Sequence, residues 1–541
     1  GFMASVDGIP RSVILINWLL GIVIIGGSRM LGRWLLSEIQ SQKKTRVIIF
    51  GAGSAGRQLL IALTQSREYK PVAFVDDKAE LQRQLIHGIE VFSRENLDFL
   101  IEKKNATEVL LAMPTISRTR RNEIINFLEP FRLLVRSLPG VSELAQGKVK
   151  VADLREVSIK DLLGRNSVAS SKELLSFNII NKVVMVTGAG GSIGSELCRQ
   201  ILFLKPQVLI MFDQSEIALY SIDQELSKTA IPSIKILPIL GSVNNTKRLN
   251  HIIKRFDVHT IYHAAAYKHV PMVEHNNSEG VSNNVFGTLN CAQIAIDNGV
   301  ETFVLISTDK AVRPTNTMGA TKRLAEMILQ AMTLIQSQVK HNSQLSAEEG
   351  QSGTRFSIVR FGNVLDSSGS VIPLFKEQIK QGGPVTVTDS EMLRYFMSIP
   401  EAVELVIQAG AMAEGGDVFV LDMGEPVRIL DLARKMIRLS GLQVKDKLNP
   451  GGDIEVEFTG LRPGEKLYEE LLIGDNVSKT DNPMILRAEE EMMAWEDLKL
   501  IIDQLEEAID RGDSFKLRQL LIKAVPGFKP QSDITDILYD T

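Results

Sequence analysis

The chain has 541 residues, of which 44% are hydrophobic and 23% are charged. This length exceeds one domain of about 100–150 residues, and the composition excludes wholesale disorder, collagen-like repeats and a polytopic membrane bundle. Lysine plus arginine (61) nearly balance aspartate plus glutamate (65), so no basic field favours nucleic acid. Two cysteines, Cys198 and Cys291, without Cys-x-x-Cys spacing, indicate a reducing compartment. We expect several domains, with the bulk of the chain in the cytoplasm.

The N-terminal segment departs from this average composition. Residues 12–28 carry no charge, and at about 1.5 Å per residue they span roughly 25 Å, the lower limit for a bilayer core of about 30 Å. Five basic residues follow: Arg29, Arg33, Lys43, Lys44 and Arg46. By the positive-inside rule they place the rest of the chain in the cytoplasm. We predict a membrane anchor over residues 1–44 that contacts the bilayer through 12–28; a buried helix or an uncleaved signal sequence is the alternative.

The next segment alternates strand and helix patterns. A buried-type strand runs into Gly51-x-Gly53-x-x-Gly56, and a second strand reaches Asp76, 25 residues after Gly51. Glycines at this spacing let a phosphate approach a helix N-terminus. No catalytic residues follow them in this part of the sequence. We therefore predict a Rossmann-like domain over residues 45–150, either a nucleotide-binding regulatory module or a vestigial structural fold.

A linker predicted over residues 151–177 leads to a more complete nucleotide-binding pattern. A strand runs into Gly188-x-x-Gly191-x-x-Gly194, and the next strand ends at Asp213, 25 residues after Gly188. A carboxylate there accepts the ribose hydroxyls of NAD and repels the extra phosphate of NADP. The fold class is therefore α/β, with a second doubly wound parallel sheet. Its further strands are expected at residues 234–239, 260–263 and 303–307.

The segment after the last of these strands decides the predicted chemistry. Thr308, Asp309 and Lys310 follow the strand, and the next helix carries Met318 and Lys322. In short-chain dehydrogenase/reductase enzymes this helix carries Tyr-x-x-x-Lys, whose tyrosine removes a hydroxyl proton. Met318 stands in the tyrosine position, and no tyrosine of the chain has a lysine four residues later. A thioether is neither acid nor base, so either the domain is inactive or other groups replace the tyrosine.

Five longer motifs identify a known family. They are His263–Glu274, Asn284–Thr288, Ser307–Asn316, Val359–Val364 and Gly460–Lys466. They resemble the membrane-bound UDP-N-acetylglucosamine 4,6-dehydratases of bacterial polysaccharide and glycan biosynthesis, over nearly the whole chain. The resemblance implies an extended short-chain dehydrogenase/reductase domain over residues 178–541, with a small substrate-binding C-terminal part and a helical tail. Long, membrane-bound members also carry methionine in the tyrosine position, which implies an active enzyme.

The activity implied by the resemblance is that of an NAD-dependent lyase. It converts UDP-N-acetylglucosamine to a UDP-4-keto-6-deoxy-N-acetylhexosamine and water through transient hydride transfer to NAD. The implied location is the bacterial inner membrane, with the catalytic domain facing the cytoplasm, and the implied assembly is a homo-oligomer. Two other functions remain open: a UDP-sugar 4-epimerase, which normally needs the tyrosine, and a non-catalytic UDP-sugar sensor or scaffold.

The resemblance also implies roles for the residues around Met318. Asp309 is the acid at sugar carbon 6, Lys310 is the base at carbon 5, and Thr308 is the partner of the carbon 4 hydroxyl. Lys310 is expected to have a pKa lowered by desolvation, because an ordinary lysine pKa is about 10.4. Lys322 is expected to bind the nicotinamide ribose.

Further residues are assigned to the two ligands. The implied cofactor-binding residues are Gly188, Gly191, Ser192, Ile193, Gly194, Asp213, Ala264 and Lys322. The implied substrate-binding residues are Lys268, Thr308, Asn363, Arg394, Arg462 and Glu465. Cationic donors suit a diphosphate, and a carboxylate suits the uridine ribose hydroxyls. His263 and His269 lack metal-ligand spacing, so both are expected to be structural, and no metal site is predicted.

Three features depart from the family pattern. The family usually has several N-terminal membrane helices, whereas one is found here, as in a shortened chain. Asp366 stands in the substrate loop where glycine is expected, and Ser242 stands where aspartate often lies beside adenine. The polar segment 336–353 is interpreted as a surface insertion without a chemical role.

Overall fold

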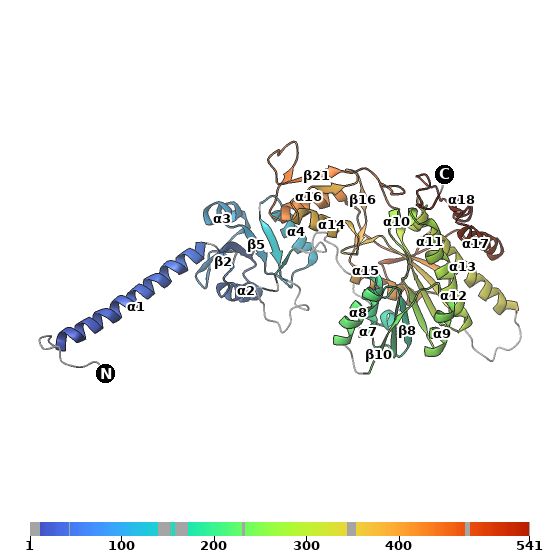
Figure 1. The fold of residues 1–541 in the computed structure, drawn as a ribbon, viewed down its shortest axis with the longest axis horizontal. Coiled ribbons are helices and arrows are strands. Elements are labelled where there is room, and N and C mark those ends of the chain that lie inside the picture. Colours follow the sequence, from blue (N-terminus) through green and yellow to red (C-terminus); the bar gives the residue numbers. More distant parts are fainter. Residues whose placement is uncertain are drawn as a thin grey trace. The chain divides into compact units, whose positions relative to one another are not determined.

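The computed structural model describes residues 11–42, 44–131, 133–138, 152, 154–156, 171–229, 233–342, 353–470 and 477–539. Contacts divide the chain into two units. One consists of Gly1–Leu162 with Ile437–Gln443, and the other of Leu163–Met436 with Val444–Thr541. Most of the predicted linker 151–177, and residues 343–352 of the predicted insertion, lie outside the described residues. Figure 1 follows the elements along the chain.

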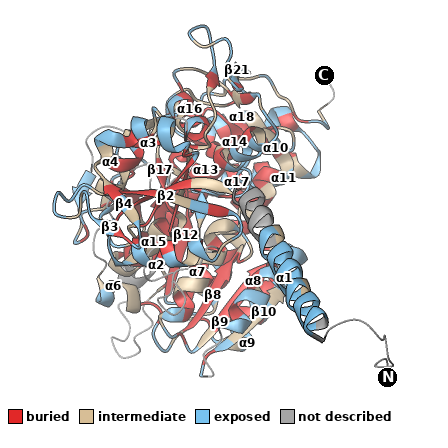
Figure 2. Ribbon diagram, turned by 90° about the vertical axis from the view of Figure 1, so that its left-hand side faces the viewer, coloured by how far each residue is buried: buried red, intermediate tan, exposed pale blue. Residues whose placement is uncertain are grey.

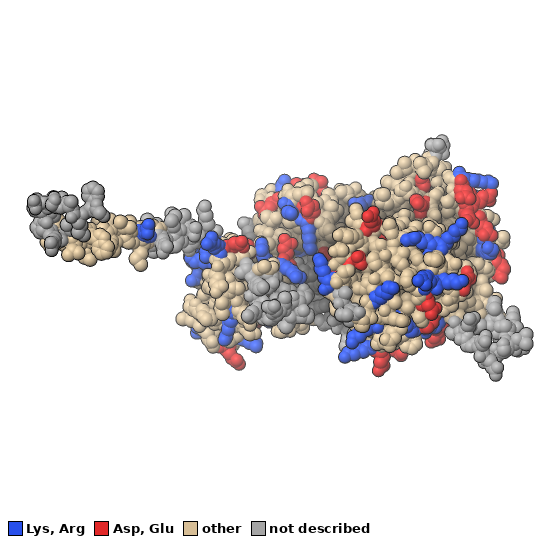
Figure 3. Space-filling model, turned by 60° about the horizontal axis from the view of Figure 1, so that its bottom comes forward, with Lys and Arg blue, Asp and Glu red and all other residues tan. Residues whose placement is uncertain are grey.

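The chain begins with the long helix α1 (Arg11–Gln42). Its segment Leu15–Gly32 is long and apolar enough to cross a membrane, and none of that segment is buried in the structure. Figure 2 shows this part of α1 as exposed, and in Figure 3 it is almost entirely free of charged side chains. The predicted uncharged stretch 12–28 lies inside this helix, which continues beyond it to Gln42.

The first unit contains a sheet flanked by helices. Its described strands are β1 (Thr45–Phe50), β2 (Tyr69–Val75), β3 (Leu85–Ile86), β4 (Ile89–Phe92), β5 (Glu108–Leu111), β6 (Leu134–Ser137) and β7 (Arg155–Glu156). The helices are α2 (Ser54–Thr64), α3 (Leu97–Lys104) and α4 (Arg118–Leu128), with the short helix η1 (Arg94–Asn96). The strand order is β3-β4-β2-β1-β5-β6-β7, and the central pairings are parallel. β1 is central because Val47–Phe50 is a continuous apolar run that needs cover on both faces.

The second unit contains a larger sheet. Its strands are β8 (Val183–Thr187), β9 (Val208–Asp213), β10 (Lys235–Leu240), β11 (Thr260–His263), β12 (Thr302–Ile306), β13 (Arg355–Arg360), β18 (Asp417–Leu421), β22 (Val477–Lys479) and β23 (Ile485–Ala488). They lie in the order β10-β9-β8-β11-β12-β13-β18-β23-β22. Strands from β10 to β18 are parallel, and β23 and β22 extend the sheet in antiparallel pairing. The strand order reverses between β8 and β11, the position where such sheets bind ligands.

Helices cover both faces of this sheet. They are α6 (Lys172–Ser176), α7 (Ser192–Phe203), α8 (Glu216–Lys228), α9 (Thr246–Phe256), α10 (Val270–Glu274), α11 (Asn277–Val281), α12 (Gly287–Asp297), α13 (Thr317–Asn342), α15 (Ile399–Met412), α17 (Trp495–Asp510) and α18 (Ser514–Ala524). Among the described residues, two further helices, α14 (Val371–Lys380) and α16 (Ile429–Leu439), do not contribute to the hydrophobic cores that flank this sheet. Two shorter turns are η5 (Ser282–Phe286), which is π-helical, and η6 (Asp309–Ala311). Figure 1 shows α17 and α18, the predicted helical tail, beside α13.

Alternation along the strands builds two hydrophobic cores. On β8, Met185 belongs to the core that includes α9, α12, α13, α17 and α18, whereas Val184 and Val186 belong to the core that includes α7, α8 and α15. Successive strand side chains point to opposite faces, so a sheet covered twice needs apolar residues at nearly every position. The buried strands and exposed α1 contrast clearly in Figure 2.

Three small sheets complete the C-terminal part of this unit. β14 (Asn363–Val364) pairs with β17 (Phe396–Met397), and β16 (Leu393–Arg394) pairs with β19 (Val427–Arg428). The third contains β15 (Val385–Val387), β21 (Ile454–Phe458) and β20 (Val444–Lys445). The first two pairs hold Asn363 and Arg394, which places both residues on ordered backbone.

Candidate active site

The glycine loop after β8 forms a close turn into α7. Gly188 has a φ of +66°, and a Cβ there would lie 2.7 Å from the backbone nitrogen of Ala265. A Cβ on Gly194 would lie 2.0 Å from the carbonyl oxygen of Gly188. Gly191 is the N-cap of α7, and Ser192 is its first residue. These positions require glycine because the backbones of two strands and one helix converge here.

Asp213 lies beside this loop at the end of β9. One carboxylate oxygen accepts the backbone N–H of Gly190 at 2.8 Å, and the other accepts that of Ser215 at 2.8 Å. A cavity of about 230 Å³ lies next to it. Four predicted cofactor residues line this cavity: Gly188, Gly191, Asp213 and Ala264. Ser192, Ile193, Gly194 and Lys322 do not line it, although Gly194 shapes the turn that bounds it.

Thr308, Asp309 and Lys310 lie together where β12 ends. The Thr308 hydroxyl donates to Oδ1 of Asp309 at 2.9 Å, and Lys310 Nζ donates to the same oxygen at 3.1 Å. Lys310 Nζ also donates to Oδ1 of Asn363 at 3.3 Å. Oδ2 of Asp309 is buried and has no hydrogen-bond partner among the described residues. The structure thus brings together four predicted residues: an acid, a base, a hydroxyl and an amide.

A fifth residue, absent from the predicted set, joins this cluster. Oε1 of Glu469 lies 3.6 Å from Lys310 Nζ, and the Glu469 side chain is only 3% exposed. Burial lowers the pKa of Lys310, but the carboxylates of Asp309 and Glu469 outweigh it and the pKa is raised. The expectation of a lowered Lys310 pKa is therefore wrong for the protein without ligands, because burial was considered without its anionic partners.

A buried ion cluster holds the end of β12 in place. Ser307, the residue before Thr308, donates to Oε1 of Glu326 on α13 at 2.5 Å. Arg360, at the end of β13, binds both Glu326 and Glu490, and all these side chains are nearly inaccessible. Buried charges are tolerated only when they are paired and fully hydrogen-bonded. Glu326 therefore ties β12, β13 and α13 into one rigid support.

Met318 and Lys322 occupy the first turns of α13. Both are buried. Burial lowers the pKa of Lys322 to about 8, although Glu326 opposes the shift. His263 is fully buried between the hydroxyls of Thr187 and Thr288, at 2.9 and 3.2 Å. Burial and the nearby charge of Lys322 lower its pKa to about 3, as suits a neutral structural histidine.

The predicted substrate cations differ in their surroundings. The Arg394 guanidinium donates to the carbonyl oxygens of Lys466 and Leu467 at 2.6 and 3.0 Å, so it fixes the loop after the Gly460–Lys466 motif. It also lies 3.5 Å from Glu465. Arg462 is exposed, and its backbone N–H donates to Glu465 at 3.2 Å. Of these residues, Arg462 alone presents an exposed guanidinium.

The remaining singled-out positions are Lys268, His269, Asp366 and Ser242. Burial and the charge of Lys310 lower the pKa of Lys268, so these two cations face the same region. Burial and then Lys268 lower the pKa of His269, whose ring packs against Gly369. Asp366 has a φ of +58°, in the left-handed region that favours glycine, which explains the glycine expected there. The Ser242 hydroxyl accepts the backbone N–H of Asn244 at 3.2 Å, and its neighbours line the 230 Å³ cavity.

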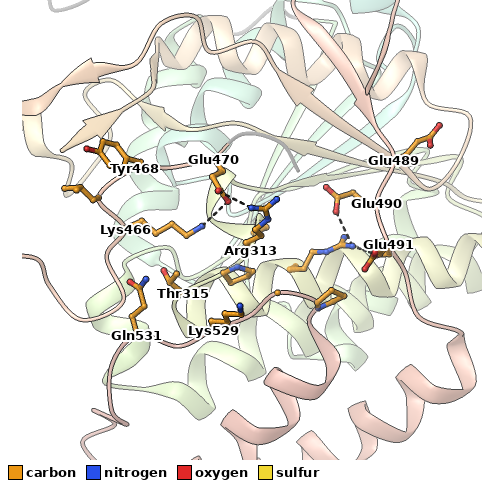
Figure 4. Close-up of a pocket in the computed structure, with 16 residues that line it drawn as sticks. Arg313, Thr315, Lys466, Tyr468, Glu470, Glu489, Glu490, Glu491, Lys529 and Gln531 are labelled. Atoms are coloured by element: carbon orange, nitrogen blue, oxygen red, sulfur yellow. Dashed lines mark hydrogen bonds and ion pairs between the residues drawn. The ribbon is translucent and has the colours of Figure 1, made fainter. Parts of the chain in front are cut away.

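Figure 4 shows a larger cavity of about 750 Å³, whose lining includes Ala311, Arg313 and Lys466. It contains none of the predicted site residues. Two of its cations share one carboxylate: Arg313 lies 3.5 Å from Glu470, and Lys466 lies 3.9 Å from the same side chain.

Comparison with known proteins assigns the family. A profile described as polysaccharide biosynthesis protein matches residues 184–490. The chain belongs to this family. The capsular polysaccharide biosynthesis protein CapD of Staphylococcus aureus is 44% identical over 465 residues, which are 84% of this chain and 74% of CapD. A UDP-glucose 4-epimerase of Rickettsia rickettsii is 35% identical over 306 residues, covering 56% of this chain and 81% of that protein.

A solved structure supports the fold of this family member. Pen from Bacillus thuringiensis is 32% identical, with a TM-score of 0.50, covering 60% of this chain and 99% of the Pen chain. The predicted membership of a polysaccharide biosynthesis family and the predicted α/β fold of extended short-chain dehydrogenase/reductase type are confirmed.

Sequence reasoning missed Glu469 and the buried ion cluster. Glu469 follows the Gly460–Lys466 motif by three residues, and Arg360 lies inside the Val359–Val364 motif. The available signal was therefore a position inside a motif for Arg360 and a position close to one for Glu469. The contacts Lys310–Glu469 and Arg360–Glu490 join residues 130 or more apart in the sequence, which no local pattern reveals.

Proposed function

We propose that the second unit is an NAD-dependent 4,6-dehydratase that converts UDP-N-acetylglucosamine to a UDP-4-keto-6-deoxy-N-acetylhexosamine and water. The observation that carries this proposal is the Asp309–Lys310 pair at 3.1 Å at the end of β12, in which the Asp309 side chain is fully buried. A dehydration needs an acid for the leaving hydroxyl and a base for the neighbouring carbon, besides the redox step. Membership of the polysaccharide biosynthesis protein family supports a role in bacterial surface polysaccharide or glycan biosynthesis.

The glycine loop fits NAD. A Cβ on Gly188 or Gly194 would collide with nearby backbone atoms, so only glycine fits this turn. The carboxylate of Asp213 lies at the adjacent cavity, where it suits ribose hydroxyls. Ser192, Ile193 and Gly194 form the α7 N-terminus that suits the pyrophosphate. Bound there, NAD would supply reversible hydride acceptance between sugar carbons 4 and 6 and would not be consumed.

The chain's own residues move the protons. Thr308 and Asp309, 2.9 Å apart, form a relay: Asp309 receives the carbon 4 hydroxyl proton through Thr308. Asp309 then gives this proton to the carbon 6 hydroxyl, which leaves as water. Lys310 takes the proton from carbon 5 and returns it to the same carbon. Over the cycle neither side chain gains or loses a proton, provided that Lys310 begins as the neutral amine.

Met318 and Lys322 complete this assignment. Because Met318 cannot accept a proton, the relay through Thr308 replaces the tyrosine. Lys322 is assigned to the nicotinamide ribose, and its buried position on α13 holds its ammonium group close to the sheet. The buried link from Ser307 to Glu326 fixes α13 relative to β12, so Lys322 and Thr308 keep a constant separation.

The UDP-sugar is assigned to the C-terminal part of the unit. Arg462, exposed on the loop held by Arg394, suits the diphosphate, and Glu465 suits the uridine ribose. Lys268 and Asn363 lie near Lys310 and suit the sugar.

The remaining proposals concern location and assembly. Helix α1 carries the length and apolar composition of a membrane anchor, and the basic residues after it favour a cytoplasmic catalytic unit at the bacterial inner membrane. Homo-oligomerisation is proposed from the superfamily resemblance.

A 4-epimerase is the second candidate, favoured by the similarity to the Rickettsia rickettsii epimerase. Product analysis separates the candidates. Purified protein is incubated with NAD and UDP-N-acetylglucosamine, and the nucleotide sugars are examined by mass spectrometry. The dehydratase yields a product lighter by one water, the epimerase yields an isomer of unchanged mass, and a sensor or scaffold leaves the substrate intact.

A further inference from the structure

Two buried carboxylate oxygens beside Lys310 lack hydrogen-bond donors among the described residues. They are Oδ2 of Asp309 and Oε2 of Glu469. The Asp309 side chain is completely inaccessible, and that of Glu469 is 3% exposed. An ionised carboxylate has only acceptor sites, and a buried acceptor without a donor is unfavourable. The two oxygens together indicate a ligand that brings hydrogen-bond donors to this place.

The other oxygen of Glu469 is already engaged. Oε1 lies 3.6 Å from Lys310 Nζ and 4.0 Å from the Arg394 guanidinium. Three oxygens therefore face the Lys310 ammonium group, from Asp309, Asn363 and Glu469, and an ammonium group has three donors. Glu469 is held by two cations through one oxygen, so its second oxygen keeps a fixed position.

The geometry points to Glu469 as a substrate-contacting residue: Oε1 positions Lys310, and Oε2 accepts a hydrogen bond from a hydroxyl or amide N–H of the hexose. This inference rests on the proposed function, since it places the reacting sugar at Lys310. The diphosphate is excluded as the partner of Oε2, because phosphate oxygens are acceptors and would be repelled by a carboxylate. A hexose with free hydroxyls supplies the donors that both oxygens lack.

Binding measurements on the full chain with NAD test the inference. In Glu469→Gln, the amide oxygen faces Lys310 and the NH₂ group replaces the accepting oxygen, so the hexose loses its partner. We expect calorimetric affinity for UDP-N-acetylglucosamine to fall about 10- to 100-fold, as for a hydrogen bond to a charged group, while affinity for UDP stays unchanged. Glu470→Gln is the matched control, since Glu470 pairs with Arg313 and Lys466 and not with Lys310.

Each other outcome counts against the inference. Equal weakening of UDP and UDP-N-acetylglucosamine would assign Glu469 a purely structural role, and unchanged affinity for both would remove it from the site. If Glu469→Gln does not fold, Glu469→Asp keeps the charge with a shorter side chain and must show the same selective loss. If the wild-type chain binds UDP-N-acetylglucosamine no more tightly than UDP, the proposed function is overturned, and this inference with it.

Discussion

The two units contain the same Rossmann-like half with different surroundings. In both, a buried central strand enters a glycine turn, and the next strand ends in an aspartate, Asp76 or Asp213, that accepts two backbone N–H groups. The donors are Ala52 and Lys78 in the first unit and Gly190 and Ser215 in the second, at 2.7 to 2.9 Å. Gly56 and Gly194 play the same part, since a Cβ on either would lie 1.9 or 2.0 Å from a carbonyl oxygen of its own turn.

The units differ at the strands that follow. Beside the first glycine of the turn, the first unit places the long side chain of Met113, whereas the second places the small residues Ala264 and Ala265. β6 is followed in sequence by Leu138, Pro139 and Gly140, whereas β12 is followed by Ser307 to Lys310. A glycine turn with a distal acid therefore predicts a Rossmann half, while the chemistry depends on residues at the ends of other strands.

The largest effect is expected from a substitution that removes Lys310, the proposed base of the second unit. Lys310→Met keeps the chain length and removes the base, so product formation should fall by a factor of about 10² to 10⁴. Product is measured by mass spectrometry. Lys529→Met, an exposed lysine elsewhere in the unit, is the control and should leave turnover unchanged. Near wild-type turnover in Lys310→Met would remove this residue from the mechanism.

The second prediction compares the two aspartates. Asp213→Ala should weaken NAD about 10- to 100-fold, as expected for lost hydrogen bonds to a charged group, and Asp76→Ala should leave NAD affinity unchanged. The wild-type chain should prefer NAD to NADP. Titration by calorimetry measures all four affinities. The opposite pattern, with Asp76 controlling affinity, would assign the cofactor to the first unit.

The third prediction follows from the raised pKa of Lys310. Lys310 must be neutral to take the carbon 5 proton, and Asp309 and Glu469 favour its protonated form, whereas Arg394 opposes it. kcat/KM should therefore increase with pH, by about tenfold per pH unit below the pKa of Lys310. The profile is measured with saturating NAD, so that the titration of Lys322 does not limit cofactor binding. A profile that falls with increasing pH across the neutral range argues against Lys310 as the base.

The smallest effect concerns the anchor. Deleting residues 1–44 removes α1, none of whose apolar segment is buried, and should release a soluble protein with the activity of the full chain. Fractionation and turnover of both forms are compared. Loss of activity in a folded, soluble product would instead make the anchor part of the catalytic machinery.

Prediction from the sequence succeeded where local patterns determine structure. The glycine turns, the apolar strands and the helix that carries Met318 and Lys322 follow from short stretches, and the structure has them close to the expected positions. The charge balance around Lys310 did not follow, because Glu469 lies far along the chain. Likewise, the support formed by Glu326, Arg360 and Glu490 joins three separate segments and leaves no periodic pattern.

The backbone conformation of Asp366 accounts for one departure from the family pattern. Asp366 departs from the expected glycine, yet it adopts the backbone conformation that glycine would favour, with φ of +58°. Aspartate tolerates this region better than most residues, so the loop keeps its shape. The sequence alone does not reveal that Asp366 keeps the backbone conformation that glycine favours at this position.

We propose that Asp309 first receives the carbon 4 hydroxyl proton through Thr308. Lys310 then removes the carbon 5 proton, and Asp309 protonates the carbon 6 hydroxyl. The reduced cofactor's near-ultraviolet absorbance, followed after UDP-N-acetylglucosamine is mixed with NAD-loaded protein, tests this order directly. In Lys310→Met, oxidation at carbon 4 still occurs, so reduced cofactor should accumulate while product does not. In Asp309→Asn, the carbon 4 proton has no acceptor, so neither should form. Reduced cofactor in Asp309→Asn would show that Asp309 acts only as the acid at carbon 6, and rapid product in both variants would contradict the account.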